Sequence, residues 1–139
     1  MLHVSGKLSH LQINVTPAGL PFYQELFTFL GWDPFVSGDG MTSFMSEGGA
    51  SLWFLAIANG ATNDRDGTGV NHIAIDADSQ AEVDATASWL RDKGIDALHD
   101  TPCHRPDFAQ SENDTYYQVM FASPDGIQFE HVYIGPKQD

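Results

Sequence analysis

Alternating apolar and polar residues mark two segments that read as copies of each other. Residues 8–15 (LSHLQINV) and 70–77 (VNHIAIDA) each place a histidine third in the segment. Alternation with a period of two predicts a strand with one buried face. Because the pattern recurs in both halves of the chain, it also predicts an internally duplicated fold. A further alternating segment, residues 127–133 (IQFEHVY), carries a carboxylate at its centre.

An amphipathic helix is predicted after each duplicated strand. Residues 22–30 repeat apolar side chains every three to four positions, with Thr16 available as an N-cap before them and Gly31 as a stop after them. In the second half, residues 79–82 (SQAE) have the form of a capping box, and Gly94 stands where a helix ends.

Three short strands are expected after each helix, which gives the order βαβββ twice. The first module covers residues 1–59 and the second covers residues 70–139, with residues 60–69, rich in Gly, Asn, Asp and Thr, as the linker within one compact domain. Residues 99–114 are expected to form a long loop that acts as a lid. The expected strands are residues 32–36, 41–45, 51–58, 95–98, 116–122 and 127–133.

Strand position decides which polar side chains share a surface, because successive side chains point to opposite faces. In the duplicated strands the apolar side chains meet the helix, which leaves His10 and His72 on the opposite, concave face. Glu130 lies on the concave face of the last strand, whereas His131 points away. Two imidazoles and one carboxylate are a ligand set for a divalent metal ion. We therefore predict His10, His72 and Glu130 as metal ligands.

Composition excludes several classes of function. The net charge of −13, from 19 acidic and 6 basic residues, repels nucleic acid and anionic membranes. No apolar segment is long enough to span a membrane, and no signal peptide is recognisable. The single cysteine, Cys103, excludes an internal disulfide and a cysteine-ligated zinc site. We expect a cytoplasmic protein that binds a small molecule.

Three motifs together resemble those of the vicinal oxygen chelate superfamily, which includes glyoxalase I, fosfomycin resistance proteins, extradiol dioxygenases and bleomycin resistance proteins. The motifs are SHLQI at residues 9–13, NHIAI at 71–75 and SPDGIQFE at 123–130. The resemblance covers nearly the whole chain. It implies an α+β fold in which tandem βαβββ repeats form a cup-shaped, incompletely closed mixed β-barrel with the helices outside. It also implies a divalent metal held by His10, His72 and Glu130.

The sequence departs from glyoxalase I at the fourth metal ligand. Alignment of the two modules places Trp53 opposite Glu130, and an indole does not coordinate a metal as a carboxylate does. A site with three protein ligands keeps positions open for water or a chelating substrate. Iron, manganese, nickel, cobalt and zinc ions all suit these ligands.

Other side chains are candidates for contact with a substrate. Arg105 is a candidate anchor for a carboxylate and His104 a candidate proton shuttle. We predict catalytic roles for Glu130, His104 and Tyr117, and substrate contacts for Gln12, Asn14, Trp53, Arg105 and Gln128.

Two classes of function remain open at this stage. The first is a glyoxalase-family metal enzyme, of lyase, isomerase or dioxygenase type, acting on a small oxygen-chelating substrate. The second is a metal-free binding protein, like the bleomycin resistance proteins, that sequesters a cationic or aromatic small molecule. Exposed sheet edges favour a homodimer in either case.

Overall fold

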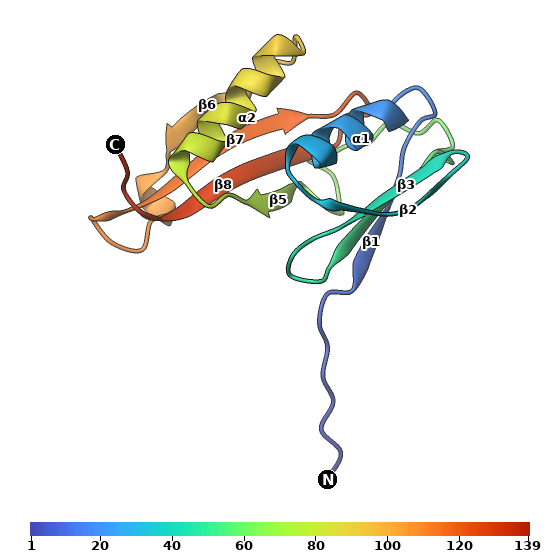
Figure 1. Ribbon diagram of the computed structural model, residues 1–139, viewed down its shortest axis with the longest axis horizontal. Helices are drawn as coiled ribbons and strands as arrows, with labels where there is room; N and C mark the ends of the chain where they lie inside the picture. Colours follow the sequence, from blue (N-terminus) through green and yellow to red (C-terminus); the bar gives the residue numbers. More distant parts are fainter. The chain divides into compact units, whose positions relative to one another are not determined.

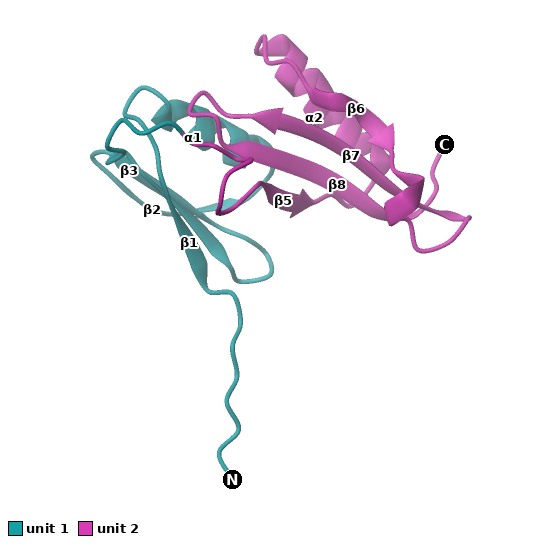
Figure 2. Ribbon diagram, turned by 180° about the vertical axis from the view of Figure 1, so that it is seen from behind, with its two compact units in different colours: residues 1–62 teal, residues 63–139 magenta.

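The computed structural model describes all residues, 1–139, and they divide into two compact units. Residues 1–62 form the first unit and residues 63–139 the second (Figure 2). Each unit contains one α-helix and one four-stranded mixed sheet, and neither sheet closes into a barrel. Both units follow the order βαβββ, which confirms the predicted α+β fold of tandem repeats. Neither helix has the length and apolar character needed to cross a membrane.

The sheet of the first unit has the strand order β1-β4-β3-β2. Strands β1 and β4 are parallel, and the other neighbours are antiparallel. Helix α1 lies across one face of this sheet (Figure 1). The elements are β1 (His10–Asn14), α1 (Leu20–Phe29), β2 (Asp33–Gly38), β3 (Met41–Met45) and β4 (Ser51–Leu55).

The sheet of the second unit repeats this plan with the order β5-β8-β7-β6. Strands β5 and β8 are parallel and the other pairs antiparallel, and α2 lies across one face (Figure 1). The elements are β5 (Ile73–Asp76), α2 (Gln80–Asp92), β6 (Leu98–His104), the short 3-10 helix η1 (Pro106–Phe108), β7 (Asp114–Ala122) and β8 (Gln128–Pro136).

Both helices end as the sequence predicts. Gly31 and Gly94 follow them with φ of 80° and 74°, a left-handed backbone that glycine adopts without a steric cost. Helix α2 also begins as predicted, because the Ser79 hydroxyl accepts a hydrogen bond from the Glu82 backbone N–H at 3.2 Å. This bond satisfies one of the free N–H groups of the first turn.

The predicted start of α1 was wrong. The helix begins at Leu20 with Gly19 as its N-cap, and Pro21 lies in its first turn. Thr16 instead accepts the Gly19 N–H at 3.0 Å, closing a turn before the helix. A threonine hydroxyl can accept the N–H three residues later both at the start of a helix and in an isolated turn. The local pattern therefore does not show which of these two structures forms.

Aromatic side chains fill the core of the first unit, between α1 and its sheet. Tyr23 stacks on Phe54 with ring centroids 4.4 Å apart, and Phe27 packs against both Phe44 and Phe54. All four side chains are buried. Their contacts fix the face of the sheet that meets the helix, and so fix the opposite face as the one that carries polar side chains.

The core of the second unit includes one histidine. His131 is buried among apolar side chains, and its Nδ1 lies 2.8 Å from the Thr86 hydroxyl of α2. Burial lowers the pKa of His131, against the opposing effect of a hydrogen bond and charge from Asp76. The side chain therefore points toward the helix, away from the face of Glu130, as predicted.

The predicted lid was wrong. Residues 99–104 belong to β6, which pairs with β7 through Cys103 opposite Gln118 and His104 opposite Tyr117, and residues 106–108 form η1. The register of this pair shifts after Leu98, where His99 and Asp100 have positive φ angles of 58° and 57°. The strand predicted at residues 95–98 was therefore misplaced, since β6 begins at Leu98 and its irregular backbone breaks the alternation by which a strand is recognised.

Candidate metal centre

Glu130 lies at the middle of β8, on the face of the sheet opposite α2. Its neighbours across the sheet are Ala74 on β5 and Met120 on β7. The residue is 1% exposed. A carboxylate so buried requires compensation by hydrogen bonds or by positive charge.

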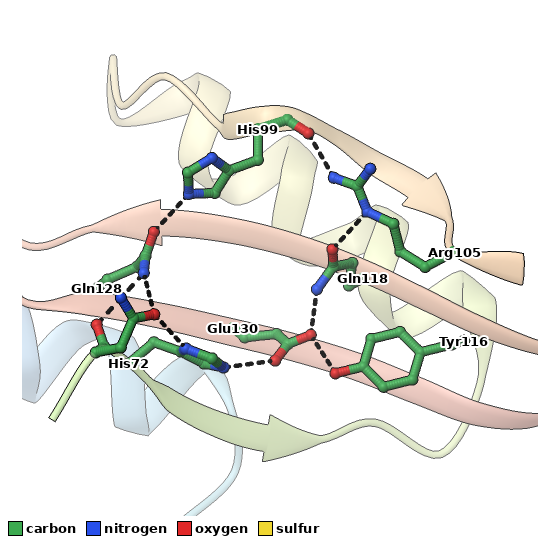
Figure 3. A network of polar contacts seen from close by, with 8 residues as sticks. His72, His99, Arg105, Tyr116, Gln118, Gln128 and Glu130 are labelled. Atoms are coloured by element: carbon green, nitrogen blue, oxygen red, sulfur yellow. Dashed lines mark hydrogen bonds and ion pairs between the residues drawn. The ribbon is translucent and has the colours of Figure 1, made fainter. Parts of the chain in front are cut away.

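Three side chains contact the Glu130 carboxylate (Figure 3). The Tyr116 hydroxyl donates to Oε2 at 2.7 Å, and the Gln118 side-chain amide donates to the same oxygen. The other oxygen, Oε1, lies 3.2 Å from His72 Nε2. The hydrogen-bond donors therefore converge on Oε2, and the imidazole faces Oε1.

Tyr116 is held as a hydrogen-bond donor. Burial, the hydrogen bond to Glu130, and the negative charges of Glu130 and Asp76 all raise the pKa of Tyr116, in that order of importance. Its hydroxyl keeps its proton at neutral pH and can donate it to Oε2.

Asn71 sets the orientation of the His72 ring. The Asn71 side-chain nitrogen donates to the Arg65 backbone carbonyl at 2.9 Å, so its oxygen is the atom that lies 2.7 Å from His72 Nδ1. An amide oxygen accepts only, and Nδ1 must therefore carry the hydrogen. Nε2 then faces Glu130 Oε1, and a proton or a metal ion between the two atoms would satisfy both.

The pair formed by His72 and Glu130 fits a divalent metal ion. An imidazole nitrogen and a carboxylate oxygen are both suitable donors, and each is fixed by a partner behind it, as metal ligands commonly are. Within neither unit do three or more His, Cys, Asp or Glu side chains gather so that they could hold a metal ion. His10, the third predicted ligand, belongs to the first unit, where it is exposed and its Nδ1 lies 2.9 Å from the Ser9 hydroxyl.

The registers of the two sheets place His10 and His72 at equivalent positions. Gln12 pairs with Trp53 across β1 and β4, and Ala74 pairs with Glu130 across β5 and β8. Each histidine lies two residues before the paired position, so Trp53 occupies in the first unit the place that Glu130 occupies in the second. The Trp53 indole N–H donates to Ser51 at 2.9 Å, and it has no lone pair with which to bind a metal.

A cavity of about 540 Å³ lies beside Trp53 in the first unit. Phe35 meets the indole edge to face, with ring centroids 5.5 Å apart, and its side chain is 53% exposed. Apolar, aromatic and uncharged polar side chains dominate the lining. The lining residues are Ser9, His10, Gln12, Phe35, Met41, Met45, Gly49, Ser51, Trp53 and Leu55.

Two of the predicted catalytic residues lie on the wrong face of the sheet. The Tyr117 hydroxyl donates to Asp84 on α2, and the His104 ring hydrogen-bonds Thr115 and packs against Tyr117. Both side chains therefore point to the helix side, away from Glu130. The sequence analysis expected both side chains to reach the substrate from a lid, whereas strand parity in β7 sends Tyr117 to the face opposite Glu130.

The remaining predicted contacts divide between the two units. Gln12 and Asn14 are exposed on β1 and hydrogen-bond each other at 3.1 Å. Gln128 donates to the Asn71 side chain at 3.1 Å, and Arg105 donates to Gln118 at 2.9 Å, so both belong to the polar network around Glu130.

Sequence reasoning did not assign Asn71, Tyr116 and Gln118 to this network, and it placed His99 only in the expected lid. A signal for two of them was present, since Tyr116 and Gln118 share the parity of Met120, the residue opposite Glu130. Asn71 adjoins a predicted ligand, but nothing in the sequence indicates how its amide is turned. His99, whose ring lies 2.7 Å from the Gln128 side-chain oxygen, has a left-handed backbone that no sequence pattern indicates.

Solved structures with this fold are named as glyoxalases, dioxygenases or bleomycin resistance proteins. A glyoxalase-like protein from Bacillus halodurans is 28% identical, with a TM-score of 0.75 over 92% of this chain and 96% of its own. A glyoxalase/dioxygenase from Nostoc punctiforme is 21% identical, with a TM-score of 0.71 over 99% of both chains. A glyoxalase/bleomycin resistance protein from Albidiferax ferrireducens is 22% identical, with a TM-score of 0.69 over 91% and 98%. No family model and no curated protein sequence matches the chain.

The tandem βαβββ modules give this chain an α+β fold of the glyoxalase type. Its fold is the one found in solved structures named as glyoxalases, bleomycin resistance proteins and dioxygenases, which form the vicinal oxygen chelate superfamily. Members of this superfamily commonly use divalent metal ions.

Proposed function

We propose that the protein is a divalent-metal enzyme of the glyoxalase type, with lyase, isomerase or dioxygenase activity on a small oxygen-chelating substrate. The metal ligands in this proposal are His10, His72 and Glu130. The contact between His72 Nε2 and Glu130 Oε1, at 3.2 Å, carries the proposal, because Asn71 fixes the ring so that Nε2 faces the carboxylate. Iron, manganese, nickel, cobalt and zinc ions all suit this donor set.

The residues of the proposed site have different roles. A bound divalent ion would supply Lewis-acid stabilisation of negative charge on substrate oxygens. Trp53, at the position equivalent to Glu130, has no lone pair with which to bind a metal, so the proposed ligand set has three protein members. Tyr116, with its pKa raised, remains a neutral donor that holds Glu130 in place.

Metal analysis of protein purified without chelators tests this proposal. We expect about one equivalent of a divalent metal per chain in the wild type and loss of that metal in His72→Ala. His3→Ala is the matched control, because His3 is exposed in the N-terminal segment and should leave metal content unchanged. Metal content that is low in the wild type and unaltered in His72→Ala would count against the enzyme and in favour of the binding protein described below.

The reaction type needs a separate assay. The metal-loaded protein should be offered 2-oxoaldehyde hemithioacetals and catechols, which chelate through neighbouring oxygens and distinguish isomerase from dioxygenase chemistry. Turnover that depends on both the added metal and Glu130 is the expected result. Turnover that persists in Glu130→Gln would contradict the assignment.

A metal-free binding protein is the second candidate, and the cavity beside Trp53 is the observation that favours it. Its uncharged, aromatic lining suits a flat ligand, and the net charge of −13 attracts a cation. Titration with a planar aromatic cation, acridine orange, tests this candidate by quenching of tryptophan fluorescence. Trp53→Phe should abolish the quenching in the presence of chelator, whereas Trp89→Phe, on α2, should not.

A further inference from the structure

We infer that Arg105 is a positioning residue of the proposed metal centre, which acts through Gln118 to make Glu130 a ligand through one oxygen, Oε1. This inference rests on the proposed function. It concerns the polar network that surrounds Glu130 on the second unit (Figure 3).

The first step is the orientation of the Gln118 amide. An amide side chain can present either its oxygen or its nitrogen to a given neighbour, and the two orientations have nearly the same shape. Arg105 Nε donates to the Gln118 oxygen at 2.9 Å. A guanidinium has donors only, so it selects the orientation in which the Gln118 nitrogen points to Glu130 Oε2.

The second step is the support of Arg105 itself. Its Nη2 donates to the backbone carbonyl of His99 at 2.7 Å, in the segment of β6 with left-handed backbone at His99 and Asp100. The His99 ring in turn lies 2.7 Å from the Gln128 side-chain oxygen, and the Gln128 nitrogen donates to Asn71. The contacts therefore link Arg105 to Asn71, which orients His72. The Arg105 guanidinium is fixed through two of its nitrogens, Nε and Nη2.

The third step is the state of the two carboxylate oxygens. Oε2 accepts from both Tyr116 and Gln118, which occupies the two lone pairs of that oxygen. Oε1 has neither of these donors and faces His72 Nε2. A cation bound beside His72 therefore meets Oε1 alone, and coordination through both oxygens would require the loss of one of the two hydrogen bonds.

The sign of the effect separates positioning from simple charge. A guanidinium close to a bound cation repels it, so removal of the charge alone would strengthen metal binding. Loss of positioning has the opposite effect, because the freed Gln118 amide can turn its oxygen toward Glu130. Removal of a supporting partner of this kind costs roughly 10-fold to 100-fold in metal affinity.

Calorimetric titration of the metal-free protein with Co²⁺ tests the inference. We expect Arg105→Met to weaken Co²⁺ binding about 10-fold, Gln118→Met to weaken it by a similar factor, and the double variant to be no weaker than Gln118→Met alone. Arg91→Met, which removes the same charge from α2, is the control and should leave the affinity unchanged. The urea midpoint of each variant reports whether the fold is intact.

The visible spectrum of the Co²⁺ protein gives a second readout. Gln118→Met frees Oε2 to join the coordination sphere, so the bands should shift relative to the wild type and to Arg91→Met. Unchanged or tighter Co²⁺ binding in Arg105→Met, with binding still lost in His72→Ala, would overturn the role of Arg105 and leave the proposed function standing. Failure of the wild type to bind Co²⁺ would overturn both.

Discussion

Tyr116 and Tyr117 are adjacent in the chain, yet their hydroxyl groups bond carboxylates on opposite faces of one sheet. The Tyr116 hydroxyl donates to Glu130 on the face that carries the candidate site, and the Tyr117 hydroxyl donates to Asp84 on α2. Both tyrosines have raised pKa values, but only Tyr116 contacts a proposed metal ligand. Substitution of Tyr117 therefore tests the packing of α2, and substitution of Tyr116 tests the candidate site.

The contribution of Tyr117 to stability should depend on alkaline pH. Burial, with the hydrogen bond and charge of Asp84, raises the pKa of Tyr117 to about 12 from its ordinary value of 10.0. Because the folded state holds the proton more tightly, the added stability is fully present below pH 10 and is lost as pH rises toward 12. The difference in urea midpoint between wild type and Tyr117→Phe should shrink across this range. Asp84→Asn should also weaken the pH dependence, and a constant difference would contradict the prediction.

Glu130→Gln should fold and lose metal affinity. Tyr116 and Gln118 both donate to Oε2, so a glutamine at this position accepts their bonds with its oxygen and turns its nitrogen toward His72. A cation would then meet an amide N–H₂ in place of Oε1, and we expect affinity to fall by more than about 100-fold.

Isothermal titration calorimetry measures this loss for Glu130→Gln. Glu112→Gln is the control, because Glu112 is exposed in the same unit. Equal metal occupancy in the two variants would remove Glu130 from the ligand set.

Thr86→Val should destabilise the second unit. Thr86 is fully buried, and its hydroxyl is 2.8 Å from His131 Nδ1. Valine keeps the shape but leaves a buried ring nitrogen without its partner, at a cost of about 1–3 kcal/mol in the free energy of unfolding. Urea unfolding measures this cost, with the exposed Thr68→Val as a control expected to stay within about 0.5 kcal/mol of the wild type. An equal effect of the two substitutions would show that the bond to His131 contributes nothing.

We propose that the protein forms a homodimer. Strand β2 is an edge strand whose six residues are all exposed, and two of them, Phe35 and Val36, are large and apolar. Unpaired edges of this kind are commonly covered by a second chain. Sedimentation at micromolar concentration should give a species of twice 15.2 kDa, and Val36→Lys should shift it toward the monomer. A single 15.2 kDa species in the wild type would contradict the proposal.

The sequence was sufficient for the parts of the fold that follow from periodicity. The duplicated strands, both helices and their terminal glycines come from regular spacing, and the bounds of β3 match the predicted residues 41–45. The face of Glu130 followed from the same alternation, and so did the opposite orientation of His131, which bonds Thr86. Local patterns determine these features because each depends on its own strand and on one packed helix.

The missed features depend on contacts between strands or on irregular backbone. The left-handed residues His99 and Asp100 have ordinary side chains for a loop, so no pattern distinguishes an irregular strand from a lid there. The closed network through Arg105 and Gln118 requires the pairing of β6 with β7 and a register shift that the sequence does not reveal. Amide orientation is likewise decided by neighbours that only the folded sheet brings together.

The exchange of a carboxylate for Trp53 at equivalent places in two modules built on one plan has a consequence for how such a protein evolves. After a gene segment doubles, each copy is free to accumulate its own substitutions while the shared scaffold is preserved. Here one module holds the buried Glu130 among hydrogen-bond donors, and the other has a cavity lined by methionine and aromatic side chains. Duplication of the module thus supplied two equivalent positions, of which one now holds a carboxylate and the other an indole.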